Sequence, residues 1–137
     1  MSQPLPSGDG LAFHGLGIAP KLLEILGKHN YSVPTPIQHK SIPVSIEGKD
    51  MIGIAQPGTG KTLSFGVPML QRLAIHKGRG LALLPTRELA LQVDETLHKL
   101  GKDMGIRTAV LIGGASMRQQ IDNLRRNPHV IVATPGR

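Results

Sequence analysis

The sequence predicts an α/β fold in which a parallel sheet is covered by helices on both faces. Two observations carry this prediction. Short, continuously apolar runs alternate with longer segments of helical character, and the first apolar run leads directly into a Gly-rich turn. Strands that are apolar along their whole length are typical of a parallel sheet that is buried on both faces, whereas a half-exposed strand alternates.

The amino-terminal third is expected to be helical. A first helix starts near Pro20, where proline suits the first helical position, and it carries Leu22, Leu23 and Leu26 along one side. A second helix follows Thr35-Pro36.

Four apolar strands and the helices between them make up the remainder. The strands are expected at 51–54, 81–84, 108–112 and 130–133. One helix opens at Lys61, and another spans 86–100 with Leu89, Val93, Leu97 and Leu100 on one face. The last helix opens with a capping box, from Ser116 to Gln119, and its expected apolar side consists of Met117, Ile121 and Leu124.

Composition narrows the class of protein. The 137 residues allow one domain at most, and the lack of cysteine excludes disulfides and thiolate zinc sites. No apolar run is long enough to span a bilayer, and residues 1–10 are expected to form a flexible lead-in to a cytoplasmic protein. The net charge of +7 favours a polyanionic partner, while only two Phe and one Tyr argue against base stacking.

The segment from Ala55 to Thr62 is the most informative part of the chain. A Gly-rich turn between a strand and a helix is the setting of a P-loop, whose backbone N–H groups cradle a polyphosphate. In this interpretation Lys61 faces the outer phosphates and the Thr62 hydroxyl binds Mg²⁺. The motif usually opens with Gly, where this chain has Ala55. The alternative is a Gly-rich connecting loop that happens to contain Lys-Thr.

Gln38 admits two interpretations. With Thr35 as N-cap and Pro36 at the first helical position, Gln38 completes a capping box. Its amide also has the donor and the acceptor needed to pair with the edge of adenine. One side chain cannot fully serve both purposes.

Three further strings follow the expected strands, at 85–90, 113–114 and 134–137. Ligands of an open parallel sheet bind beyond the carboxyl ends of its strands, where the Gly-rich turn also lies. Each string offers backbone N–H groups or hydroxyls to phosphate, and two of them add an arginine. Taken singly, each string is better explained as turn and cap chemistry.

Taken together, these strings resemble the start of a DEAD-box RNA helicase, and the bacterial members most closely. The resemblance runs from about Phe13 to Arg137 and implies a RecA-like domain that binds ATP, Mg²⁺ and the RNA backbone. It places Phe13, Tyr31 and Gln38 around the adenine. The resemblance identifies Ala55, Gln56, Pro57, Gly58, Thr59, Gly60, Lys61 and Thr62 as motif I, the ATP-binding motif of the family. Pro57 stands where the family usually has Thr. The resemblance implies RNA contacts for Pro85, Thr86, Arg87, Gly113, Gly114, Thr134, Pro135, Gly136 and Arg137.

The resemblance also sets the expected organisation and activity. It implies a lead-in at 1–10, a Q-motif region at 11–39 and part of the first RecA-like domain at 40–137. No Asp-Glu-Ala-Asp string occurs before Arg137, so we expect a fragment of an ATP-dependent RNA helicase that folds poorly and lacks turnover by itself. The alternatives are a non-catalytic module that binds nucleotide or RNA, and an unrelated P-loop ATPase.

Overall fold

The computed structural model describes residues 13–58 and 60–137. The expected lead-in at 1–10 and Thr59 of the Gly-rich turn lie outside the described residues. The chain divides into two compact units, Met1–Arg72 and Leu73–Arg137, which we describe in turn.

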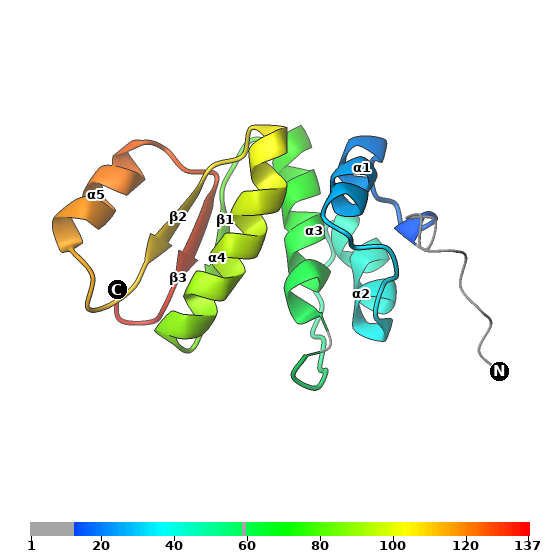
Figure 1. Ribbon diagram of the computed structural model, residues 1–137, viewed down its shortest axis with the longest axis horizontal. Coiled ribbons are helices and arrows are strands. Elements are labelled where there is room, and N and C mark those ends of the chain that lie inside the picture. Colours follow the sequence, from blue (N-terminus) through cyan, green and yellow to red (C-terminus); the bar gives the residue numbers. More distant parts are fainter. Residues whose placement is uncertain (1–12, 59) are drawn as a thin grey trace. The chain divides into compact units, whose positions relative to one another are not determined.

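Unit 1 is helical. Helix α1 spans Pro20–Lys28, α2 spans Pro36–Ile46, and α3 spans Lys61–Ile75, whose last turn passes into unit 2 (Figure 1). Its fully buried side chains are Phe13, Leu22, Leu26, Ile42, Val67 and Leu70. Gln71 of α3 ties the segment before α1 to this core, because its Oε1 accepts from the N–H of Ala19 at 2.7 Å and its Nε2 donates to the Gly17 carbonyl at 2.9 Å.

The end of α1 follows the rules for helix termination. Asn30 takes a left-handed conformation with φ of 67° directly after the C-cap. The N–H of Asn30 then donates to the Gly27 carbonyl at 3.0 Å, and that of Tyr31 donates to the Leu26 carbonyl at 2.9 Å. This bond pair is the Schellman motif, in which Asn often takes the left-handed position. The motif sets the position of Tyr31, one of the residues that the sequence links to adenine.

Unit 2 is built on a parallel sheet of three described strands. Strand β1 spans Gly80–Leu83, β2 spans Thr108–Leu111, and β3 spans Val130–Ala133, in the order β1-β3-β2. Leu81 pairs with Ile131, and Ile131 pairs with Ala109. These three strands were predicted to within one residue at each end.

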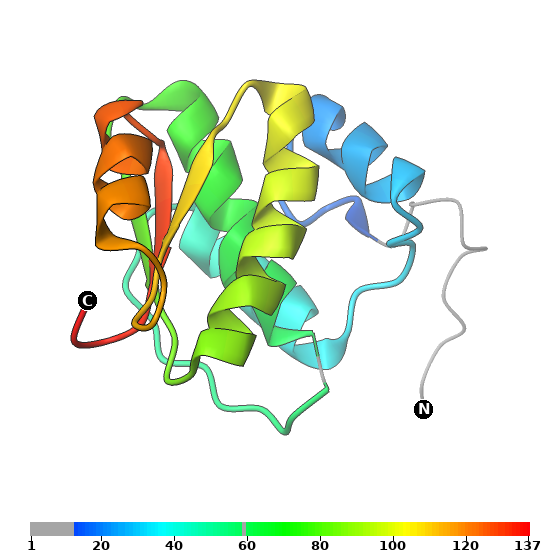
Figure 2. The same ribbon diagram turned by 60° about the vertical axis from the view of Figure 1, so that its left-hand side comes forward.

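Helices cover this sheet on both faces. The chain crosses from β1 to β2 by α4 (Arg87–Gly101) and the short helix η2 (Lys102–Met104), and it returns from β2 to β3 by α5 (Met117–Arg125). The two crossovers run in opposite directions, so their common right-handedness places α4 and α5 on opposite faces. Figures 1 and 2 both show the strands between these helices. The expected fold class is thereby confirmed.

The helices differ in detail from the prediction. Within α4, Val93, Leu97 and Leu100 are buried as expected, but Leu89 is exposed. On α5 the expected apolar side is wrong, since Met117 and Ile121 are exposed and the buried residue is Gln120.

The predicted strand at 51–54 is wrong. This segment is irregular, and Ile52 and Ile54 are each 91% exposed. A strand forms only when a neighbour satisfies its backbone hydrogen bonds, and none of the described strands pairs with this segment. The apolar composition of this segment shows that its side chains can be buried, but it does not determine which part of the protein would cover them.

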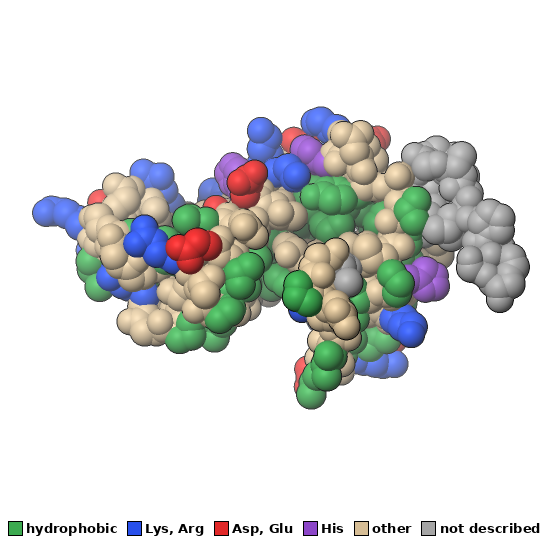
Figure 3. Space-filling view, turned by 60° about the horizontal axis from the view of Figure 1, so that its bottom comes forward, with side chains coloured by type: hydrophobic (Ala, Val, Ile, Leu, Met, Phe, Trp, Pro, Cys, Tyr) green, Lys and Arg blue, Asp and Glu red, His purple; other side chains and the backbone are tan. Residues whose placement is uncertain are grey.

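One face of the edge strand β1 is also uncovered. Side chains alternate along a strand, and register aligns neighbouring strands, so Leu81 and Leu83 share a face with Ile131. Leu81 is 59% and Leu83 is 61% exposed, whereas Ala82 on the other face is buried. Hydrophobic side chains lie at the surface of each unit (Figure 3). No helix among the described residues is long and apolar enough to cross a membrane.

Candidate functional site

The Gly-rich turn precedes α3 directly. Pro57 and Gly58 form a turn, and Gly58 has φ of 79°. Proline followed by a glycine with positive φ is typical of the two central positions of a type II turn. Proline at this place has no N–H, so the loop has one donor fewer than a loop with Thr. Gly60 is also left-handed, with φ of 83°, immediately before Lys61 opens the helix. The first N–H groups of α3 have no partner within the helix, and they lie at its positive end.

Lys61 closes the loop on itself. Its ammonium donates to the Ala55 carbonyl at 2.8 Å, which joins the two ends of the turn. Lys61 is exposed and Thr62, next to it, is half-buried. A cation and a hydroxyl at the start of a helix, beside unpaired N–H groups, form an arrangement suited to a polyphosphate.

Gln38 connects the helix α2 to this loop. It is only 4% exposed, and it completes the capping box because its Oε1 accepts from the Thr35 N–H at 2.9 Å. Its Nε2 donates to the Gly60 carbonyl at 3.0 Å. Each end of the amide has thus used one of its two hydrogen-bonding positions, and one donor and one acceptor remain. Capping therefore does not use up the hydrogen-bonding groups of Gln38, and its contact with adenine stays a prediction.

The contact with Gln38 requires glycine at position 60. A Cβ at Gly60 would collide with the Gln38 amide nitrogen and would lie 3.2 Å from Cγ2 of Thr35. The conformation with positive φ disfavours any other residue in addition. The glycine is therefore required by the neighbouring helix as well as by the turn.

The two aromatic residues that the resemblance assigns to adenine differ in exposure. Phe13 is 1% exposed and belongs to the core of unit 1, whereas Tyr31 is half-buried. Their contact with adenine stays a prediction.

In unit 2 the three strings lie at the carboxyl ends of the three strands, as predicted for a parallel sheet. Thr86 caps α4 by accepting from the Leu89 N–H at 3.2 Å, and Arg87 follows it at the exposed first turn. The Arg87 side chain reaches the turn after β2, since a Cβ at Gly114 would lie 2.6 Å from its Nη1. Gly114 has φ of 80°, and Gly113 beside it has open space around it. A phosphate group is able to approach both backbone N–H groups closely.

Arg137 is held against the same edge by a residue that the sequence analysis missed. Its Nη1 donates to Oε1 of Gln120 at 3.3 Å and to the Ala115 carbonyl at 3.4 Å. Gln120 is 5% exposed, and its Nε2 donates to the Ile112 carbonyl at 2.8 Å. The available signal was a glutamine on the inner side of α5, three residues after Met117. The preceding Thr134, Pro135 and Gly136 form the turn, with Gly136 at φ of 93°.

The parallel sheet of unit 2 is that of an α/β protein, and the Gly-rich turn of unit 1 leads directly into α3 as a P-loop does, although the segment before the turn is not a strand. The family profile described as DEAD/DEAH box helicase matches residues 35–137. This match includes the Gly-rich turn and all three strings of unit 2. The chain belongs to the DEAD/DEAH box helicase family.

Similar proteins agree with this assignment. The ATP-dependent rRNA helicase RRP3 of Scheffersomyces stipitis is 50% identical over 127 residues, which cover 91% of this chain and 26% of that protein. RRP3 of Saccharomyces cerevisiae (strain ATCC 204508 / S288c) is 48% identical over 128 residues, 92% of this chain and 26% of that protein. The chain spans about a quarter of the length of the curated relatives it matches. These relatives are yeast proteins, so the expected likeness to bacterial members is not supported.

Solved structures confirm the RecA-like fold. The RNA helicase Prp28 from Chaetomium thermophilum, bound to ADP, has a TM-score of 0.80 and 36% identity over 90% of this chain and 32% of that chain. Dbp5 of S. cerevisiae, bound to RNA and ADP BeF3, has a TM-score of 0.76 and 33% identity over 91% of this chain and 32% of that chain.

Proposed function

We propose that this chain is the part of an ATP-dependent RNA helicase that binds ATP and contacts the RNA backbone. The observation that carries the proposal is the bond from Gln38 to the Gly60 carbonyl. It links the side chain suited to read adenine to the loop suited to hold phosphate. The relatives named ATP-dependent rRNA helicase, and the similar structures bound to ADP, support the same function.

The residues of the loop fit ATP and Mg²⁺. The N–H groups at the start of α3 and the Lys61 ammonium supply donors and positive charge for the β- and γ-phosphates. The Thr62 hydroxyl is the oxygen that this chain offers to Mg²⁺. When bound, Mg²⁺ would neutralise charge on the phosphate oxygens. The contribution of the protein to such chemistry is to position groups and stabilise charge.

The strings of unit 2 fit an RNA strand bound by its backbone. Arg87 and Arg137 flank glycines that leave room for phosphate, and residues 73–137 contain no Phe, Tyr or Trp. Backbone contacts position a strand without identifying its bases. We therefore propose an RNA site with little sequence preference.

Binding of fluorescent ADP and GDP to the 137-residue chain tests the proposal. Lys61→Ala should weaken both nucleotides, and Gln38→Ala should weaken ADP more than GDP. Gln119→Ala is the matched control, because Gln119 occupies the same position in α5, but its side chain donates to Oδ1 of Asn123 on the same helix at 3.1 Å. Equal losses for ADP and GDP in Gln38→Ala would leave Gln38 as a capping residue and remove the main support for the proposal.

Hydrolysis distinguishes the alternative function. We expect no RNA-stimulated ATP hydrolysis by this chain alone, since the sequence up to Arg137 contains no Asp-Glu-Ala-Asp string. Hydrolysis should appear in any longer product of the same gene that contains an Asp-Glu-Ala-Asp string, and it should disappear in the Lys61→Ala variant of that product. Nucleotide binding without hydrolysis in that longer product would favour a non-catalytic binding module.

A further inference from the structure

Two arginines from different strands converge on one asparagine at the amino end of the sheet. Arg79 precedes β1, and its Nη2 donates to Oδ1 of Asn127 at 3.1 Å. Arg107 precedes β2, and its Nη2 donates to the backbone carbonyl of Asn127 at 2.9 Å. Asn127 itself precedes β3. This cluster therefore lies at the end of the sheet opposite to Arg87 and Arg137.

The position of Asn127 follows from the end of α5. Asn127 has φ of 54° directly after the C-cap, and its N–H donates to the Leu124 carbonyl at 3.1 Å. Left-handed Asn in this place terminates a helix. The turn directs both oxygens of Asn127 toward the two guanidinium groups. Local chain geometry thus holds two like charges near one another.

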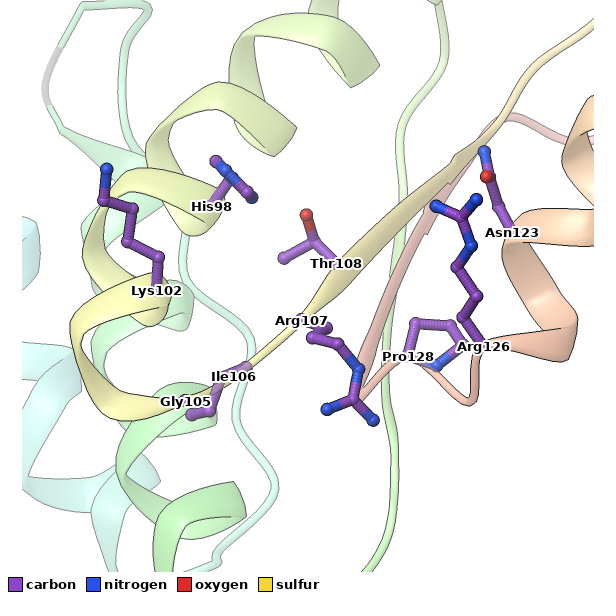
Figure 4. Close-up of a pocket in the computed structure, with 9 residues that line it drawn as sticks. All are labelled: His98, Lys102, Gly105, Ile106, Arg107, Thr108, Asn123, Arg126 and Pro128. Atoms are coloured by element: carbon purple, nitrogen blue, oxygen red, sulfur yellow. The ribbon is translucent and has the colours of Figure 1, made fainter.

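A cleft adjoins this cluster. It has a volume of about 430 Å³ at the amino end of β2. Figure 4 shows its basic side chains, which are His98 from α4, Lys102 from η2, Arg107 from the start of β2 and Arg126 from the end of α5. None of the described residues that line it is acidic.

The three arginines at this end are not paired with carboxylates in the part of the chain that the structure describes. Arg79, Arg107 and Arg126 have no carboxylate partner within residues 13–58 and 60–137. Unit 2 as a whole has ten Lys and Arg against five Asp and Glu. Guanidinium groups that are held together without a carboxylate repel one another, and a bound anion would remove this cost.

We propose that this cleft, with Arg79, Arg107 and Arg126, is a second RNA site that binds phosphates of the backbone. The RNA ligand rests on the proposed function, but the site itself rests on this cluster. The planar guanidinium group matches two phosphate oxygens at once. A β-strand rises about 3.3 Å per residue, so this site and the RNA site at the carboxyl ends are separated by the length of the β-strands. We therefore expect it to bind a flanking segment of the RNA that is bound at the carboxyl ends.

The lining favours RNA over an acidic peptide. A peptide usually needs an apolar anchor in addition to charge, and the apolar lining residues Ile106 and Pro128 are buried. The basic residues also come from the three separate connections that lead into β1, β2 and β3. A backbone with regularly spaced phosphates is able to contact all three connections.

The test is binding of single-stranded oligouridine to the 137-residue chain without nucleotide, between about 50 and 200 mM salt. The triple variant Arg79→Gln, Arg107→Gln, Arg126→Gln should weaken binding by roughly tenfold or more. It should also flatten the plot of log affinity against log salt by roughly two, since each lost phosphate contact removes about 0.7. Arg126→Gln alone should show part of this effect without lowering thermal stability, because its backbone N–H keeps its bond to the Asn123 carbonyl and its side chain makes no hydrogen bond to the described residues.

Arg125→Gln is the matched control. It removes the same charge one residue away, from a side chain that is paired with Asp122 at 3.8 Å. Equal effects of Arg125→Gln and Arg126→Gln would overturn the proposal by showing a general charge effect. Binding of polyglutamate as tight as that of RNA, and equally sensitive to Arg126→Gln, would identify a peptide site instead. Loss of RNA binding in Arg87→Gln alone would refute this site and leave the proposed function intact.

Discussion

Replacing Gln38 by alanine tests whether one buried amide joins helix α2 to the Gly-rich loop. The variant removes two hydrogen bonds of the side chain, to the Thr35 N–H at 2.9 Å and to the Gly60 carbonyl at 3.0 Å. Both partners remain part-buried after the change. The bond from the Gln38 backbone N–H to Thr35 is unaffected, and the Gly60 carbonyl keeps a weaker donor, the Ser64 hydroxyl at 3.4 Å.

These contacts determine the expected magnitude. A hydrogen bond contributes about 0.5–1.5 kcal/mol to stability, so the loss of two should lower the free energy of unfolding by about 1–3 kcal/mol. For a chain of this size, about 4 °C of Tm corresponds to each kcal/mol. We therefore expect Tm to fall by about 4–12 °C.

Thermal unfolding followed by circular dichroism measures this change, provided that the unaltered chain melts cooperatively; a broad melt of the unaltered chain would instead bear out the expectation that it folds poorly. The control Gln119→Ala should stay within about 0.5 kcal/mol of the unaltered chain, because Gln119 is exposed. A Tm of Gln38→Ala equal to that of the control would refute the reasoning.

Three further changes test other features. Gly114→Ala should displace Arg87 and force a left-handed alanine, at a cost of about 1–2 kcal/mol together with weaker RNA binding, whereas Gly113→Ala has open space and should leave the Tm unchanged. Gln120→Ala should lower stability by about 1–3 kcal/mol in thermal unfolding, because it leaves the Ile112 carbonyl unpaired; a neutral result would contradict its positioning role. Leu81→Gln should reduce light scattering at constant Tm, since its side chain is 59% exposed; a lower Tm would show that this face is covered.

The sequence predicted the fold where local pattern and sheet pairing agree. The strands from 80 to 133 are short apolar runs, each between a helix and a turn, and each finds a parallel neighbour. The segment 51–54 has the same pattern but no described neighbour. Strand formation depends on a partner that lies elsewhere in the chain, and no property of the segment itself reports that partner.

In the candidate site, too, features that depend on neighbouring residues were predictable, whereas contacts between distant residues were not. The turn at Pro57 and Gly58, the start of α3 at Lys61, and the cap at Thr35 depend on residues close together in sequence, and all were predictable. The bond from Gln38 to Gly60 spans 22 positions, and that from Gln120 to Arg137 spans 17. Pairings of this kind arise from the packing of separate elements, so sequence patterns indicated the chemical groups but not their partners.

The turn at Pro57 has a consequence for the heat of nucleotide binding. Its ring restricts the backbone before any ligand arrives, so the loop loses less conformational entropy when a phosphate orders it. The missing N–H also removes one favourable contact with that phosphate. Titration calorimetry of the unaltered chain should therefore show a smaller favourable enthalpy, and a smaller opposing entropy, than Pro57→Thr. Two loops of similar affinity would then differ in the temperature dependence of that affinity.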